Sequence, residues 1–281
     1  MIDVNHDSES LAEKYDQISK YQYINGMALV EQLNISARHK VLDVGCGTGR
    51  LTLKLANKVD HITGIDPSPQ RIEVAHRKLT RMNQGNITFE LGSSDDICRY
   101  GEDIFDIVYM NAVFHWINDK EEALDNIYRV LKPGGRLGIC TGDKDHPFTV
   151  KIIAKEVLQR AGIIDEGVDF SAPVNKVELD SLLRKSGFRV IEIELKRDPR
   201  YFETPAECLE YVEASSFGNF MSNIPVSVRK KIKAEIMAEL KKYQTSKGIE
   251  SIYYDLFALA EKSLDNSSKK IYQDIYALFR E

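Results

Sequence analysis

The sequence predicts an α/β fold in which a mostly parallel sheet is covered by helices on both faces. Seven runs of strand length alternate, over most of the chain, with segments of helical periodicity, an order typical of βαβ units. A glycine-rich turn follows the first run, and Asp66 ends the second. At 281 residues the chain is long enough for one large α/β domain with insertions.

The most informative stretch is residues 39–66. A short apolar run is followed by three alternating glycines, Gly45, Gly47 and Gly49, and then by the start of a helical segment. Glycine tolerates positive φ and lets a ligand approach the bare backbone. Because Asp66 ends the next strand, its carboxylate is well placed to accept hydrogen bonds from ribose hydroxyls. This unit predicts a nucleoside pocket at the carboxyl ends of parallel strands.

The spacing of the glycines indicates which nucleoside cofactor fits. A dinucleotide fingerprint, G-x-G-x-x-G, would place its third glycine where this chain has Arg50. Asp43 stands two residues before the first glycine, where its charge would repel a pyrophosphate and suit a cationic cofactor. The run D-x-G-x-G-x-G resembles the motif of class I S-adenosylmethionine (SAM)-dependent methyltransferases. The resemblance implies cofactor contacts from Asp43, Gly45, Cys46, Gly47, Gly49, Asp66 and Pro67.

The next βα unit extends this pattern. Ser68, between two prolines, predicts the N-cap of a helix that runs to about Met82. A third strand is expected at 87–91, and the resemblance places adenine contacts just after it, at Ser94 and Asp95. A simple turn with a capping aspartate is the alternative interpretation of this segment.

A fourth strand is expected at 104–110, and the segment 111–119 follows it. Asp119 predicts an N-cap, with two glutamates in the first turn of the helix that it begins. The helix should end before the turn Lys-Pro-Gly-Gly at 132–135, which leads into a fifth strand at 136–140.

The turn L-K-P-G-G, the strand F-D-I-V and the segment F-H-W-I-N-D resemble those of small-molecule methyltransferases, over residues 10–141 and 186–262. The H-W-x-x-D segment looks most like the trans-aconitate, juvenile-hormone-acid and malonyl-carrier-protein methyltransferases, which methylate carboxylates. The resemblance implies a Rossmann-like, doubly wound sheet of seven strands, mostly parallel and with the last strand antiparallel. It also implies a cofactor contact from Asn111.

The second half of the chain adds helices to the sheet. Helical periodicity covers 146–185 around an acidic loop at 162–173, and a strand with period-two alternation follows at 189–195. Two further helices within 203–246 interrupt the sheet, which the chain rejoins at 251–260. A last helix, 268–280, must pack on the domain or on a second copy of the chain.

Residues 9–33 are also predicted to be helical, and they carry an unusual density of tyrosine. They are either an amphipathic helix packed on the sheet or a lid that brings Tyr15 and Tyr21 near the reacting methyl group. The organisation expected from the resemblance is a single domain, 1–281, with lid elements at 1–37, 143–175 and 203–248.

The acceptor site is expected from aromatic residues. The predicted substrate contacts are Tyr15, Tyr21, His115, Trp116 and Phe217. If the acceptor is a phenol, amine or thiol, His115 is the candidate base, with Tyr15 as a second catalytic candidate. A carboxylate acceptor is ionised at neutral pH and needs no base. Polar capping of a strand by His115 and core packing of Trp116 are the alternatives. An anionic acceptor would also require a cation, for which Arg197 and Arg200 are unplaced candidates.

Composition narrows the class of protein. The net charge is −5, and hydrophobic residues make up 43% of the chain, without any apolar run of membrane-spanning length. The four cysteines are scattered, so neither a disulfide framework nor a metal site is implied. We therefore expect a cytoplasmic protein, monomeric or homodimeric, that binds neither nucleic acid nor membrane.

The predicted function is a SAM-dependent methyltransferase, a transferase that acts on a small molecule, possibly at a carboxylate. The alternatives are N-, C- or S-directed small-molecule methylation, SAM binding without turnover, and a nicotinamide-dependent dehydrogenase.

Overall fold

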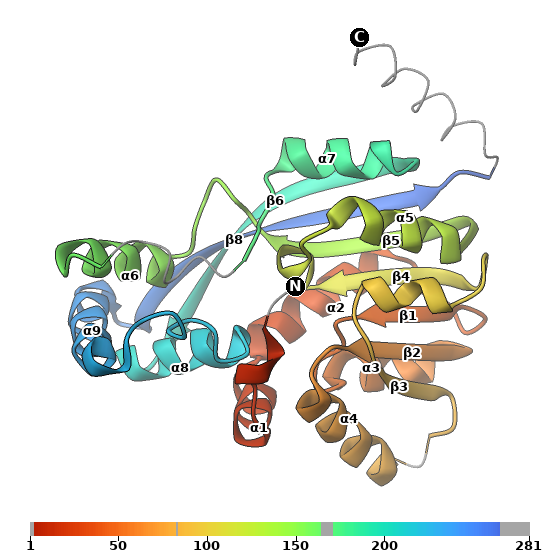
Figure 1. Ribbon diagram of the computed structural model, residues 1–281. Coiled ribbons are helices and arrows are strands. Elements are labelled where there is room, and N and C mark those ends of the chain that lie inside the picture. The colour runs from red at the N-terminus through yellow and green to blue at the C-terminus, as the bar shows by residue number, and fades with distance from the viewer. Residues whose placement is uncertain (1–2, 83, 164–170, 265–281) are drawn as a thin grey trace.

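The structure is a computed structural model that describes residues 3–82, 84–163 and 171–264 (Figure 1). The predicted helix at 268–280 and most of the predicted acidic loop at 162–173 lie outside the described residues. Within the described part of the chain, no helix combines the length and apolar character that crossing a membrane requires.

A sheet of eight strands forms the centre of the molecule, in the order β3-β2-β1-β4-β5-β8-β6, with β7 paired to β8 off this path. The strands are β1 Lys40–Val44, β2 His61–Asp66, β3 Ile87–Leu91, β4 Phe105–Asn111, β5 Leu131–Gly142, β6 Phe188–Phe202, β7 Gln244–Thr245 and β8 Gly248–Lys262. Neighbouring strands from β3 to β5 are parallel, whereas β8 is antiparallel to both β5 and β6. The predicted doubly wound sheet of seven strands with an antiparallel last strand is confirmed, and β7 is a short addition.

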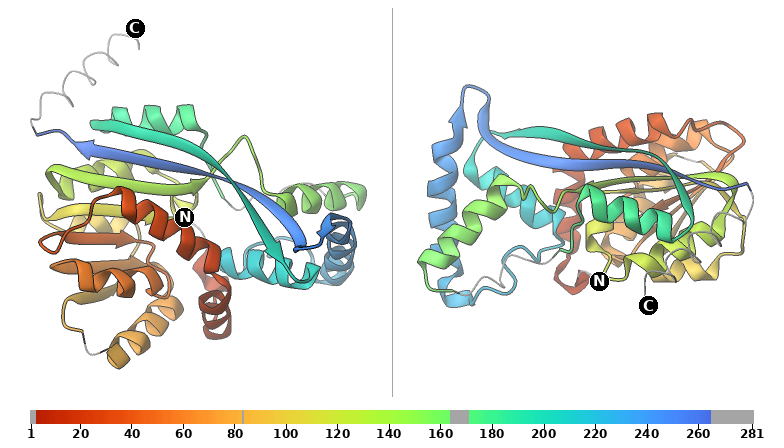
Figure 2. Two further views of the ribbon diagram at one scale, coloured as in Figure 1. Left: turned by 180° about the vertical axis from the view of Figure 1, so that it is seen from behind. Right: turned by 90° about the horizontal axis from the view of Figure 1, so that it is seen from above.

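Helices cover both faces of the sheet (Figures 1 and 2). The α-helices are α1 Glu9–Ile18, α2 Lys20–Gln32, α3 Arg50–Leu55, α4 Pro69–Met82, α5 Lys120–Val130, α6 Thr149–Arg160, α7 Lys176–Lys185, α8 Pro205–Ser215 and α9 Val226–Leu240. Short 3-10 turns include η3 Asp95–Arg99 and η4 Phe114–Trp116. The buried clusters place α2, α3 and α4 on one face and α5 and α7 on the other.

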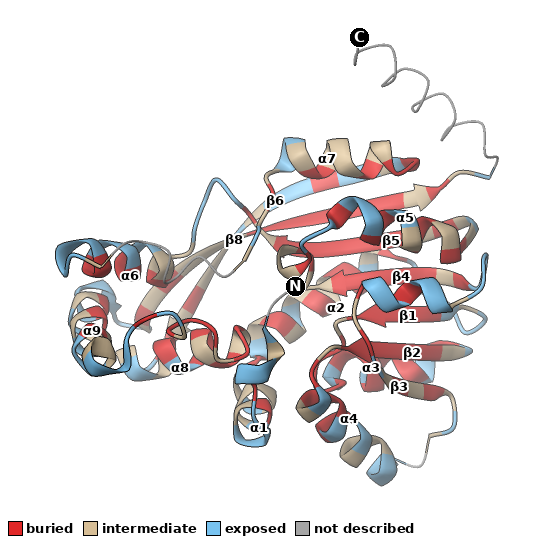
Figure 3. Cartoon of the chain, in the orientation of Figure 1, coloured by how far each residue is buried: buried red, intermediate tan, exposed pale blue. Residues whose placement is uncertain are grey.

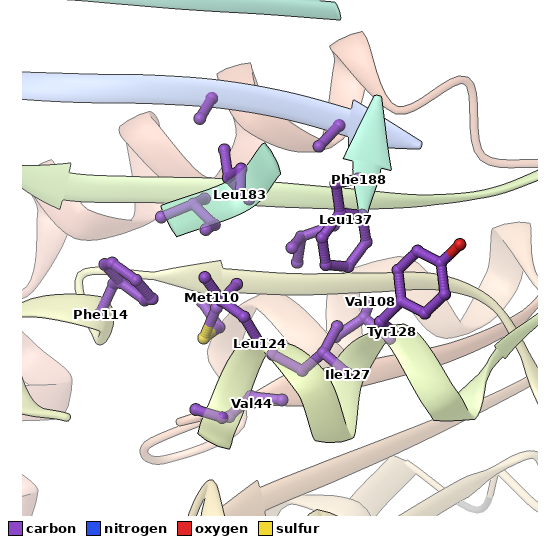
Figure 4. Close-up of a cluster of buried hydrophobic side chains, with 14 of the residues drawn as sticks. Val44, Val108, Met110, Phe114, Leu124, Ile127, Tyr128, Leu137, Leu183 and Phe188 are labelled. Atoms are coloured by element: carbon purple, nitrogen blue, oxygen red, sulfur yellow. The ribbon is translucent and has the colours of Figure 1, made fainter. Parts of the chain in front are cut away.

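The core on the α5 side is built from the stripe predicted for that helix. Leu124 and Ile127 are fully buried and share one cluster with Val44, Val108 and Met110 of the parallel strands (Figure 4). The cap of α5 is also confirmed, since the Asp119 side chain accepts a hydrogen bond from the backbone N–H of Glu122 at 2.9 Å. The central strands are almost wholly buried (Figure 3).

The predicted turn at 132–135 is not a separate turn, because β5 already begins at Leu131. The pairing with β4 skips these residues, since Phe105 faces Leu131 and Ile107 faces Arg136. The segment is therefore an irregularity in the pairing of β4 with β5, and Gly134 has a φ of 76°, as predicted for a glycine of this segment.

The last two long strands extend well beyond the predicted ranges 189–195 and 251–260. β6 and β8 are 15 residues each and pair with one another along their whole length. Their far ends leave the parallel sheet and meet α6, α8 and α9 (Figures 1 and 2). There Phe202 and Ile249 join a third buried cluster with residues of these helices. This extension gives the inserted helices a core of their own.

The N-terminal helical segment is interrupted at Ser19, which separates α1 from α2. The second helix, α2, packs on the sheet through Leu29 and Leu33. The first helix, α1, contacts α4 and α8, so it bridges the sheet domain and the inserted helices.

Candidate cofactor and acceptor site

A cavity opens at the carboxyl ends of the parallel strands, where the inserted helices meet the sheet. Its lining comes from strand ends, from α1 and α2, from the segment that leads into α6, and from α8. We distinguish two sides of it. The glycine-loop side contains Gly45, Gly47, Asp66, Ser94 and Asn111, and the aromatic side contains His115, Trp116, Tyr211, Phe217 and Tyr254.

The glycine loop is held by backbone hydrogen bonds. The N–H of Gly45 donates to the carbonyl of Ile65 at 2.7 Å, and the N–H of Gly47 donates to Asp66 Oδ2 at 2.8 Å. Gly47 has a φ of 55°, and a Cβ there would meet only the Tyr15 ring, 3.4 Å away. The backbone at Gly47 is therefore open toward the cavity, as the sequence predicts for a ligand-binding glycine.

Asp66 lies at the end of β2 and lines the cavity, as predicted. Its Oδ1 accepts from the N–H of Ser68 at 2.9 Å, and its other oxygen accepts from Gly47. Burial raises the pKa of Asp66, while the Arg71 charge opposes that rise. Each carboxylate oxygen retains a second lone pair for a ligand hydroxyl.

Asp43 does not line the cavity. It is buried below the loop, where Oδ2 accepts from Thr52 Oγ1 and from Tyr109 OH, each at 2.6 Å. Burial raises the pKa of Asp43 to about 7. The predicted direct contact to a cofactor is therefore not retained, because the side chain points into the packing between β1, β4 and α3.

Two other residues of the loop that were predicted to contact the cofactor, Cys46 and Gly49, contribute to packing within the protein. Cys46 is buried, and its Sγ lies 3.7 Å from the carbonyl of Gly47. Gly49 has a φ of 74°, and a Cβ there would collide with Phe89 at 2.5 Å. Gly49 therefore permits close approach of α3 to the sheet.

Two residues that line the cavity, Gln22 and Asn111, each have a buried amide oxygen without a hydrogen-bond partner among the described residues. Asn111 Nδ2 donates to the carbonyl of Gln22 at 2.8 Å, and Gln22 Nε2 donates to Ser215 Oγ at 3.0 Å. Among the described residues, no donor reaches Asn111 Oδ1 or Gln22 Oε1. An unsatisfied buried acceptor is costly, and two of them suit a ligand that carries donors and positive charge, such as an ammonium group. Gln22 was not predicted, because a polar residue in a helix is usually exposed.

At the far end of the glycine-loop side, Pro67 and Ser94 line the cavity as predicted. Asp95 does not, since its carboxylate is exposed and accepts from Ser94 Oγ at 3.1 Å. The alternative interpretation, a simple turn with an aspartate, fits this segment better, but the aspartate that holds the turn is Asp96, whose Oδ2 accepts from the N–H of Ser93 at 2.7 Å.

The two tyrosines of the predicted lid differ in their position relative to the cavity. Tyr15 lines the cavity and stacks with Arg71, whose Cζ lies 4.2 Å from the ring centroid. Burial raises the pKa of Tyr15. Tyr21 lies outside the lining; its hydroxyl accepts from the N–H of Tyr201 at 2.7 Å and donates to the Tyr201 carbonyl at 3.0 Å. We do not retain Tyr21 as a substrate contact, because its polar atom is fully used in holding α2 to β6.

The remaining predicted acceptor residues come together on the aromatic side. The rings of His115 and Trp116 are 4.5 Å apart, and Phe217 meets Trp116 edge-on at 6.2 Å. His115 Nδ1 lies 2.9 Å from Thr141 Oγ1. Burial, aided by nearby cations, lowers the pKa of His115 to about 3. The imidazole is therefore neutral and a weak base at neutral pH, so the predicted role as general base does not fit.

Arg71 links the lids to the sheet domain and was not predicted. It is buried, and its Nε pairs with Asp7 at 2.9 Å while Nη2 donates to the Ala214 carbonyl at 2.8 Å. Its guanidinium also stacks on Phe217, with Cζ 3.6 Å from the ring centroid. A basic residue in the first turn of α4 carries no sequence signal for this role.

Arg200 lines the cavity, whereas Arg197 is half-exposed and does not. Two carboxylates neutralise Arg200: Asp198 at 2.8 Å and Asp255 at 2.7 Å. Its Nη1 also donates to Tyr211 OH at 2.8 Å. Arg200 is therefore not an unopposed cation awaiting an anionic acceptor.

Comparisons with known proteins agree with this geometry. Residues 35–187 match a family described as methyltransferase domain. The chain is 38% identical over 156 residues to O-methyltransferase cnsE of Penicillium expansum, which covers 54% of this chain and 53% of that protein. It is 27% identical over 271 residues to malonyl-[acyl-carrier protein] O-methyltransferase of Halalkalibacterium halodurans, with 91% and 96% covered.

Among solved structures, the YcgJ protein of Bacillus subtilis superposes with a TM-score of 0.62 at 17% identity, covering 85% of this chain and 98% of that one. The chain spans about half the length of several curated relatives that it matches, cnsE among them. The predicted resemblance to malonyl-carrier-protein methyltransferases and to the methyltransferase family is confirmed. The chain belongs to the methyltransferase domain family.

Proposed function

We propose that this chain is a SAM-dependent methyltransferase that methylates an oxygen atom of a small molecule. One observation carries the proposal: a single cavity is lined both by the glycine loop with Asp66 and by the aromatic side with Trp116 and Phe217. A cofactor and an acceptor held in these two places would lie beside one another, and such proximity is worth roughly 7–11 kcal/mol of a reaction barrier.

The glycine-loop side fits SAM. We assign the cationic end of the cofactor to the unpartnered oxygens of Gln22 and Asn111, and the ribose to Asp66. We assign the adenine end to Pro67 and Ser94. When bound, SAM supplies an electrophilic methyl group on a cationic sulfonium. The protein's own task is then to orient the acceptor and to keep water away.

The aromatic side favours a small acceptor with an oxygen nucleophile. Tyr15, Trp116 and Phe217 leave room for a small molecule enclosed between the lids and the sheet. The two relatives described above are both named O-methyltransferases, and one of them acts on a malonyl group. The acceptor oxygen belongs to a carboxylate, which needs no base, or to a hydroxyl group, which does.

The wider organisation belongs to the same proposal. We propose a single domain over residues 1–281, with lid elements at 1–37, 143–175 and 203–248, because cavity residues come from all three. We also propose a monomer or homodimer that resides in the cytoplasm and does not bind nucleic acid. Size-exclusion chromatography with light scattering and cell fractionation test these points.

The central test is calorimetry with SAM and with NAD, followed by a product-mass screen. We expect SAM to bind and NAD not to bind. The purified protein, incubated with methyl-labelled SAM and a small-metabolite extract, should yield a labelled small molecule with the methyl group on oxygen. Binding of SAM without any product would indicate a non-catalytic binding protein, and a labelled N, C or S atom would replace the proposed acceptor class.

A further inference from the structure

We propose that His146, oriented by Asp143, is the general base that deprotonates the acceptor. The acceptor group is then a hydroxyl, phenolic or enolic, rather than a carboxylate. This inference rests on the proposed methyl transfer and adds to it a catalytic residue and a substrate class. Neither His146 nor Asp143 was indicated by the sequence motifs.

The pair is built into the fold at the end of β5. Asp143 is only 6% exposed, and its backbone N–H donates to the carbonyl of Tyr254 at 2.9 Å. His146 follows three residues later, and its Nδ1 lies 2.6 Å from Asp143 Oδ2. The His146 ring also stacks on Tyr254, with centroids 4.6 Å apart and planes at 30°. The hydrogen bond to Asp143 and the ring contact with Tyr254 together fix the orientation of the imidazole.

The hydrogen bond also determines which nitrogen is available. An ionised carboxylate only accepts, so Nδ1 is the protonated nitrogen of a neutral His146 and Nε2 keeps its lone pair. A carboxylate that holds an imidazole in this tautomer is the arrangement of serine-protease and related triads. Nε2 of His146 is therefore prepared to take a proton.

The location suits the role. His146, Asp143 and Tyr254 line the same cavity as Gly47 and Asp66. The His146 side chain is 47% exposed while that of Asp143 is 3% exposed, so the base can pass a proton to solvent and its orienting group cannot leave.

The other histidine of the cavity cannot do this work. His115 has a hydroxyl partner, Thr141, instead of a carboxylate, and it lies in an electropositive environment. Of the two histidines that line the cavity, His146 alone has an aspartate on Nδ1 among the described residues. The acceptor base is therefore assigned to His146 rather than to the predicted His115.

The presence of a base also separates the two classes of acceptor. A carboxylate is ionised at neutral pH and would have no proton for His146 to remove. A hydroxyl acceptor has such a proton, so a base oriented by a buried carboxylate is of use to a hydroxyl acceptor only.

The proposed step moves one proton and one methyl group. His146 Nε2 takes the hydroxyl proton as the acceptor oxygen forms a bond to the methyl carbon. The bond between that carbon and the sulfonium sulfur breaks, and its electron pair stays on sulfur, which becomes a neutral thioether. The imidazolium then releases its proton to water. No oxidant, reductant or further reactant is required.

The experiment uses the full chain, methyl-labelled SAM and the small-metabolite extract. The labelled product is treated with alkali, which releases methanol from a methyl ester and leaves a methyl ether intact. We expect an alkali-stable label. Release of labelled methanol would identify a carboxylate acceptor and overturn the inference while leaving the proposed methyl transfer in place.

Variants then test the residue itself. His146→Ala should lower the rate of product formation by about 10²–10⁴-fold, with unchanged SAM affinity by calorimetry, and added imidazole should restore part of the rate. Asp143→Asn, which changes the tautomer, should lower the rate with the fold retained by circular dichroism. His76→Gln, an exposed residue outside the cavity, is the matched control and should retain the rate.

Two outcomes would overturn the assignment: a His146→Ala protein as fast as wild type, or a slow one that imidazole does not rescue. If wild type binds SAM but forms no methylated product, the proposed function itself fails, and this inference fails with it.

Discussion

The two sides of the cavity are assembled from different distances along the chain. On the glycine-loop side, Gly45, Gly47 and Asp66 lie within two consecutive βα turns, and the N–H groups of the two glycines donate to the Ile65 carbonyl and to the Asp66 carboxylate. On the aromatic side, Trp116 and Phe217 are about a hundred positions apart and meet through their side chains. Local geometry thus organises the side that we propose binds the cofactor, whereas the side that we propose binds the acceptor depends on long-range packing.

Arg71 joins the two sides, and its replacement should have the largest effect. Arg71→Met leaves Asp7 buried without its partner and frees the Ala214 carbonyl. We expect a loss of about 3–5 kcal/mol in the free energy of unfolding, measured by urea denaturation. Arg77→Met, on the same helix but with exposed partners Glu9 and Glu13, is the matched control.

The control should change stability by about 0–1 kcal/mol, as is usual for exposed ion pairs. Equal effects of the two substitutions would contradict the view that Arg71 connects the sides. A double variant, Arg71→Met with Asp7→Asn, should recover part of the loss because the unpaired charge is gone.

Asp66→Ala should affect the glycine-loop side selectively. It removes the acceptor for the Gly47 and Ser68 N–H groups and the proposed ribose contact. We expect SAM affinity to fall about 5- to 150-fold, from a loss of roughly 1–3 kcal/mol. Calorimetry measures it, and an Asp66→Ala protein that binds SAM as tightly as wild type would refute the assignment.

Tyr21→Phe tests whether Tyr21 holds α2 to β6 rather than contacting the substrate. It removes the hydroxyl that bridges the N–H and carbonyl of Tyr201. We expect a loss of about 1–2 kcal/mol in stability, with SAM affinity and the KM for the acceptor unchanged. A raised KM at unchanged stability would instead return Tyr21 to the substrate site.

A further prediction concerns the pH dependence of stability. Burial raises the folded-state pKa of Asp43 to about 7, above its usual value near 3.9. Between these two pKa values the folded chain holds the Asp43 proton more tightly than the unfolded chain does. The free energy of unfolding therefore falls as pH rises from about 4 to 7, by at most about 1.4 kcal/mol per pH unit.

Asp43→Asn keeps an acceptor for Thr52 and Tyr109 but cannot ionise. Its unfolding free energy, measured from pH 5 to pH 8, should therefore fall less than that of wild type. A variant whose stability follows pH in parallel with wild type would show that Asp43 is ionised in the folded chain throughout this range.

Much of the fold was predictable because its signals are local. The order of strands and helices, the cap at Asp119 and the glycine positions follow from short-range periodicity and backbone conformation. The lengths of β6 and β8 were underestimated, because their far ends are stabilised by the inserted helices rather than by the sheet. The same helices bring Phe217 into the site.

Within the site, the sequence motifs predicted which segments lie near the cavity better than they predicted which side chains line it. Asp43 stands in the motif but points into a core, and Tyr21 stands in the lid but binds a strand. Gln22, Arg71 and His146 line the cavity without any motif. A side chain's direction depends on the strand and helix against which it packs, and spacing along the chain does not contain that information.

The sequence by itself determined the sheet, the glycine loop and the class of cofactor, because a run of alternating glycines between a strand and a helix restricts the backbone locally. Tertiary structure alone decided which polar groups face the cavity. Asp143 and His146 are three residues apart, yet only the pairing of β5 with β8 places Tyr254 against them and turns both toward the cavity. If the proposed base is correct, contacts between segments distant in the chain decide which acceptor is used.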